Sequence, residues 1–65
     1  MEGMEIRVAR VKEGLRQVDI AHGAGISQPA LSRIERGELI PSQKTLRQIM
    51  NAINDRTSPH TKNNY

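Results

Sequence analysis

Residues 17–37, with the sequence QVDIAHGAGISQPALSRIERG, decide the fold of this chain. The first part spaces its apolar residues along one face of a helix, and Gly25 then favours the left-handed conformation that ends a helix. Ser27 is a suitable N-cap for a second helix, whose apolar residues again fall on one face. The sequence therefore predicts two short helices, over residues 17–24 and 28–36, joined by a tight glycine turn.

The second of these helices collects polar and small residues on the face opposite its apolar ones. That face holds Gln28, Pro29, Ser32, Arg33 and Arg36. Two helices joined by such a turn form a helix-turn-helix, which places its second helix in the major groove of DNA. Glutamine bonds adenine, and arginine bonds guanine, through paired hydrogen bonds. We therefore expect base contacts from Gln28, Pro29, Ser32 and Arg33. A solvated polar face, with Pro29 serving only to start the helix, is the alternative.

The chain resembles the Cro and phage-repressor family of helix-turn-helix domains, also called XRE-type regulators. The matching residues are Arg10, Gly14-Leu15, Gln17, Ile20-Ala21, Gly25-Ile26-Ser27, Leu31-Ser32-Arg33-Ile34-Glu35-Arg36-Gly37, Pro41-Ser42 and Leu46. The resemblance implies an all-α, lambda-repressor-like domain of four helices that binds double-stranded DNA. It also implies transcription regulation, most simply by a repressor of phage or mobile-element type.

Two further helices complete the expected domain. The first covers about residues 4–13 and ends at Gly14, and the last is capped by Ser42 and covers about residues 43–53. Residues 1–53 are therefore the expected helix-turn-helix domain.

Residues 54–65 are expected to form a flexible tail. This segment contains one aromatic and no aliphatic residue, so it has little apolar surface with which to offset the entropy of ordering. Relatives in the family commonly continue into a fifth, apolar helix that builds their dimer, and we expect no such helix in residues 54–65. We therefore expect a monomer, or a weak homodimer that forms mainly on DNA.

Arg10 and Glu35 are expected to form a structural salt bridge. Each lies one turn after an apolar residue, at the edge of a buried face, and a partly buried charge needs a partner. The family pairs an arginine with a glutamate at these positions. Two solvated surface charges are the alternative.

Contacts with the DNA backbone are expected near the starts of helices, where free amides and cations meet phosphates. The candidates are Arg16, Gln17, Arg36, Gln43 and Lys44. For Gln17 the role comes from the family, in which the matching glutamine touches a phosphate and a second glutamine opens the recognition helix. Each of these residues is also of a type common on ordinary surfaces.

Composition excludes several other classes of function. The net charge is +3 and there is no cysteine, which suits a cytoplasmic partner of nucleic acid and provides no thiolate for a metal. His22 and His60 are too few and too isolated to bind a metal, and the sequence does not bring a nucleophile, a base and an orienting group together. We expect no catalysis, no cofactor and no membrane segment.

The alternative function is that of a protein-interaction module, such as an antitoxin or a subunit of a larger complex. Leu39 and Ile40 motivate it, because two adjacent aliphatic residues in a loop do not easily both point inward.

Overall fold

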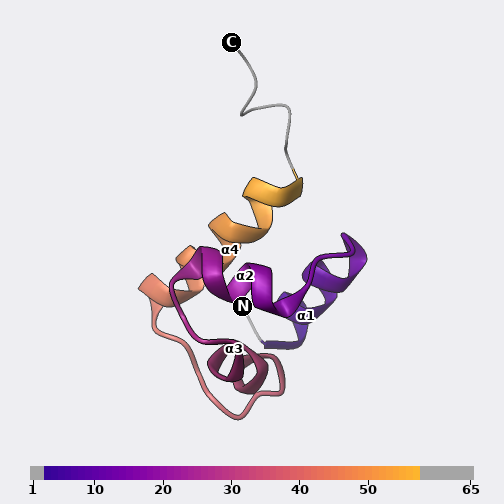
Figure 1. The fold of residues 1–65 in the computed structure, drawn as a ribbon. Helices are drawn as coiled ribbons and strands as arrows, with labels where there is room; N and C mark the ends of the chain where they lie inside the picture. Colours follow the sequence, from indigo (N-terminus) through magenta and orange to yellow (C-terminus); the bar gives the residue numbers. More distant parts are fainter. Residues whose placement is uncertain (1–2, 58–65) are drawn as a thin grey trace.

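The computed structural model describes residues 3–57, which form four helices and no strand. In chain order these are α1 (Gly3–Lys12), α2 (Gln17–Ala24), α3 (Gln28–Glu35) and α4 (Gln43–Thr57). Figure 1 shows α2 at the centre of the view, with α3 below it, α1 on the right and α4 above. The predicted all-α fold of four helices is confirmed.

The ends of the two central helices are set by local chemistry. Gly25 ends α2 at φ 75°, and its N–H bonds carbonyl oxygens of the last turn. Ser27 then caps α3, because its Oγ accepts a hydrogen bond from the Ala30 N–H at 3.2 Å. Ser42 does the same for α4 by accepting from the Thr45 N–H at 3.1 Å. The glycine turn and both serine caps follow from residue type alone.

The core is built from all four helices. Ile6, Ile20, Leu31 and Ile49 are completely buried, one from each helix. The rest of the buried apolar set consists of Ala21, Ala24, Ile34, Ala52 and Ile53. Packing this core turns α3 so that its apolar face points inward and its polar face points to solvent.

The helices α2 and α4 pack closely through small residues. A Cβ added at Gly23 would lie 3.1 Å from the Cβ of Ala52, tighter than ordinary van der Waals contact. Glycine within a helix costs up to about 1 kcal/mol relative to alanine. The close approach of α4 is a packing reason for that glycine.

The helix ends depart from the expected ones most clearly at α4, which was expected to end near residue 53 and continues to Thr57. The sequence between residues 54 and 57 contains neither glycine nor proline, and Arg56 in the last turn suits the helix dipole. The expected boundary between domain and tail therefore falls inside a helix. The flexibility expected for residues 58–65 concerns residues outside those the structure describes.

Candidate nucleic-acid interface

The helix α3 presents the predicted polar face to solvent. Leu31 and Ile34 are buried, whereas Gln28, Pro29 and Arg33 are exposed. Ser32 is half-buried. Pro29 occupies the first turn of α3, where a missing N–H costs no intrahelical bond.

A buried ion pair fixes α3 against α1. Arg10 donates from Nε to Glu35 Oε2 at 2.8 Å and from Nη2 to Glu35 Oε1 at 2.9 Å. Its Nη1 donates to the Leu15 carbonyl oxygen at 2.8 Å. The guanidinium therefore joins α1, α3 and the link before α2 with one planar fork. Among the described residues, every buried polar side-chain atom has a hydrogen-bond partner.

A chain of amides leads from this pair to the first residue of α3. Gln17 Nε2 donates to Glu35 Oε1 at 3.1 Å, and Gln28 Nε2 donates to Gln17 Oε1 at 3.4 Å. The amide of Gln17 is thus engaged at both ends, and it orients the side chain of Gln28. Sequence reasoning missed this role, although both glutamines open helices that are consecutive in the chain.

At the other end of α3, Arg36 is held by a carboxylate. Its Nε and Nη2 donate to the two oxygens of Glu38 at 2.9 and 3.1 Å, and its Nη1 donates to Ser32 Oγ. Gly37, at φ 79°, turns the chain so that the two charged side chains meet. The hydrogen bond from Arg36 lowers the pKa of Glu38, and the same bond raises the pKa of Arg36.

A second surface pair occupies the start of α2. Arg16, the N-cap residue, makes no side-chain cap bond. It donates instead from Nε to Asp19 Oδ2 at 3.0 Å and from Nη2 to Asp19 Oδ1 at 3.4 Å. This hydrogen bond lowers the pKa of Asp19. The pairing of Arg16 and Arg36 with carboxylates is a feature that the sequence prediction of phosphate contacts did not include.

The remaining candidates for phosphate contact open α4. Gln43 and Lys44 are both exposed in its first turn, beside the cap formed by Ser42. Amide N–H groups in the first turn of a helix lack intrahelical partners. The start of α4 therefore offers both backbone donors and a cation to an anion.

A family model described as Helix-turn-helix matches residues 6–58, a span that includes nearly all of the four helices. The chain therefore belongs to the helix-turn-helix family of Cro/C1 or XRE type, whose members are DNA-binding transcription regulators. No curated protein and no solved structure matches the chain. The predicted family resemblance is confirmed.

Residues 3–57 also bear on metal binding and on membrane insertion. His22 is exposed on α2, and in this part of the chain no three potential metal-ligating side chains lie together. None of the described helices has both the length and the apolar character of a membrane span. His60 lies outside the described residues.

Proposed function

We propose that this DNA-binding regulator is sequence-specific, a repressor of phage or mobile-element type that inserts α3 into the major groove. One observation carries this proposal: Gln28 is exposed at the start of α3 and is oriented by an amide chain anchored on the buried Glu35. A side chain held in place before binding loses less entropy when it bonds a base. Occupying an operator in this way would exclude the polymerase, a mechanism that needs no catalytic group.

In this proposal the residues of α3 divide by what they can bond. Gln28 can bond adenine and Arg33 can bond guanine through paired hydrogen bonds. Ser32 is restricted by its bond with Arg36, and Pro29 contributes apolar contact, as with a thymine methyl group. Anchoring to the DNA backbone comes from the first turns of α2 and α4, where the main-chain N–H groups of Gln17 and Lys44 would meet phosphates.

The test begins with selection of bound duplexes from a random pool, followed by anisotropy titrations on the selected and on random DNA. Gln28→Ala should weaken binding to the selected site by about 1–3 kcal/mol, leave random DNA almost unaffected and relax one base position. Lys44→Ala should weaken both duplexes alike, because a phosphate contact carries no sequence information.

The control is Asn51→Ala, which removes an exposed amide from the middle of α4 and should change neither titration. Equal weakening of selected and random DNA by Gln28→Ala would make Gln28 a backbone contact. Failure of the selection to enrich any sequence would overturn the proposal of sequence-specific binding.

A protein-interaction module is the second candidate, and Ile40 favours it. Its side chain is 89% exposed, the largest exposure among the big apolar residues described, and its neighbour Leu39 is 38% exposed. Contiguous exposed apolar surface marks protein contacts, and Leu39 and Ile40 together provide such surface in this loop. Under this alternative Ile40→Ser would abolish partner binding and leave DNA affinity unchanged, whereas under the leading proposal it would affect neither folding nor operator binding.

A further inference from the structure

The outward face of α1 carries a stripe of exposed apolar residues between charged ones. Met4, Val8 and Val11 follow one another at spacings of four and three residues, which places them along one side of the helix. These residues are 58%, 55% and 55% exposed. Ile6, on the opposite side, is buried in the core. A surface helix is normally polar on its outward side, so α1 has the pattern of a helix covered on both sides. We call Met4, Val8 and Val11 the α1 stripe.

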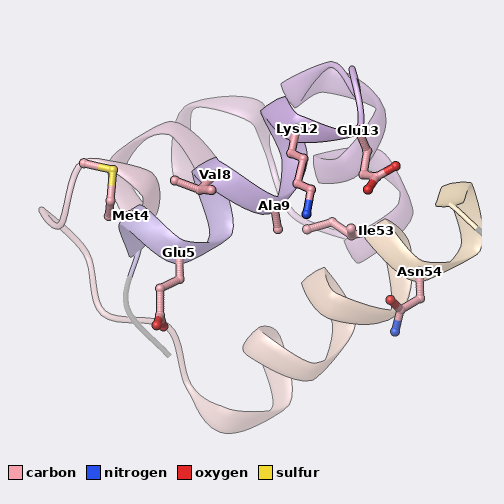
Figure 2. A pocket seen from close by; sticks show the side chains of 8 residues that line it. All are labelled: Met4, Glu5, Val8, Ala9, Lys12, Glu13, Ile53 and Asn54. Carbon is pink, nitrogen blue, oxygen red and sulfur yellow. The ribbon is translucent and has the colours of Figure 1, made fainter.

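The two edges of the α1 stripe differ in charge and in neighbours. Figure 2 shows the edge nearest α4, where Glu5 and Lys12 border a groove that also contains Ala9 and Ile53. Glu5 and Lys12 are seven residues apart, or about two helical turns. They therefore lie on the same edge, with the acid near the start of α1 and the base at its end.

The opposite edge of the stripe faces the recognition helix. Arg7 lines a hollow together with Ser32 and Arg36 of the α3 region and with Glu35. This edge therefore continues onto the surface that the proposed function assigns to DNA. Unlike the edge with Glu5 and Lys12, this edge carries a cation, Arg7, but among residues 3–57 no acidic residue that could pair with Arg7 of an antiparallel second copy.

We infer that the α1 stripe is the surface on which a second copy of this chain docks, with its α1 antiparallel to the first. In a two-fold symmetric pair both copies use the same patch. Each edge of the stripe therefore lies against the same edge of the other copy, running in the opposite direction. Glu5 of one copy then lies beside Lys12 of the other, and this attraction occurs twice. The apolar side chains of the two stripes cover each other around Val8.

The size and charge of the contact make this pairing weak until DNA is present. Three side chains form a surface far smaller than the roughly 800 Å² per partner of a stable interface. On the edge facing α3, two Arg7 side chains approach each other, which opposes pairing in solution. Phosphates between them would remove that repulsion. This last step rests on the proposed function, whereas the docking of the two stripes does not.

The first test uses the absence of cysteine from the chain. Val8→Cys places a single thiol at the centre of the stripe. The control, Val18→Cys, places a single thiol on α2, at a residue whose exposure of 45% is similar to that of Val8. Under mild oxidation without DNA, Val8→Cys should form disulfide dimers at least tenfold faster than Val18→Cys on a non-reducing gel. Equal rates would overturn the interface.

The second test addresses the orientation of the two helices. Lys12→Glu should weaken self-association in sedimentation at high protein concentration, and the double variant Glu5→Lys with Lys12→Glu should restore it. No recovery in the double variant would overturn the antiparallel arrangement. Circular dichroism of each variant shows whether the fold is kept.

A third measurement separates this inference from the proposed function. Val8→Asp should keep its affinity for a single selected half-site and lose cooperative binding to two adjacent half-sites. If instead the chain bound no DNA selectively while Val8→Cys still cross-linked, the interface would stand and the proposed function would fall. Cooperativity unchanged by Val8→Asp would overturn the role of the stripe on DNA.

Discussion

Glu35 connects the core of the molecule to its candidate DNA surface at the scale of single residues. It is 3% exposed, a position that a carboxylate tolerates only with strong partners. Arg10 gives it two hydrogen bonds and Gln17 gives it a third. Gln17 also accepts a hydrogen bond from Gln28. The buried carboxylate of Glu35 therefore helps to orient the side chain of the first residue of α3.

Removing one member of the buried pair should be costly. Arg10→Met leaves Glu35 buried without its cation, and we expect a loss of about 3–5 kcal/mol in the free energy of unfolding. Replacing both, as Arg10→Met with Glu35→Met, should recover most of that loss, since apolar residues of similar size often substitute for a buried pair. Urea unfolding measures both variants. A loss below about 1 kcal/mol for Arg10→Met would contradict the buried role.

Glu38 should restrain DNA binding by competing with phosphates for Arg36. We expect Glu38→Gln to raise affinity for random DNA and to steepen the salt dependence by about one phosphate, a change of about −0.9 in the log–log slope. Because the hydrogen bond from Arg36 lowers the pKa of Glu38, this carboxylate stays ionised to a pH below the usual glutamate range, so the effect should be the same at pH 6 and pH 8. Anisotropy titrations at several salt concentrations measure it.

The control for this prediction is Glu13→Gln, which removes the same charge from an exposed residue beside the α1–α4 groove. It should change the slope much less. If both variants changed the slope equally, net charge alone would account for the effect.

At the scale of helices, the features that could be predicted from the sequence are those that depend on neighbouring residues. The glycine at 25 and the serine at 27 act on their own neighbours, so residue type was sufficient to predict the turn and the cap. Gly3 and Gly23 are needed for contacts with other helices: a Cβ at Gly3 would overlap the Ile34 carbonyl oxygen. No neighbour in sequence reveals such a contact, and these roles were therefore not predicted.

The same distinction explains the outcome for the candidate site. The polar face of α3 follows from helical periodicity, which is a local property. The pairing of Arg36 with Glu38 depends on the turn made at Gly37, and the bond from Gln17 to Glu35 depends on how α2 packs near α3. Sequence reasoning therefore identified Gln17 and Arg36 without their acceptors. It did pair Arg10 with Glu35, because both lie at the edge of an apolar face and the family pairs these positions.

The close packing of α2 and α4 gives a prediction about Gly23. We expect Gly23→Val to destabilise the protein by about 1–3 kcal/mol, because its branched side chain overfills the contact with Ala52. Gly23→Ala should change stability by less than about 1 kcal/mol, since the gain in helix propensity offsets the tight Cβ contact. Thermal unfolding measures both. Equal stability of the valine and alanine variants would show that α4 moves away freely.

At the scale of the whole molecule, the ten lysines and arginines overstate the number of cations available to DNA. Arg10, Arg16 and Arg36 each bond a carboxylate. Two of these carboxylates, on Asp19 and Glu38, stand beside cations that the sequence assigned to phosphates. The candidate interface is therefore less cationic than its arginines suggest, and random DNA should be held weakly, with a salt slope of about −2 to −3 for each copy.

This arrangement limits affinity for DNA of any sequence, and a double variant tests it. Phosphate contacts carry no sequence information, so arginines released from their carboxylates should strengthen binding to selected and random DNA alike. Asp19→Asn with Glu38→Gln should therefore steepen the salt slope on both duplexes by about 1.8, two phosphates in all. The ratio of the two affinities should stay unchanged. Anisotropy on both duplexes measures the slopes and the ratio, and thermal unfolding checks that α2 is intact. A ratio that fell in the double variant would mean that the two carboxylates also improve discrimination between sequences.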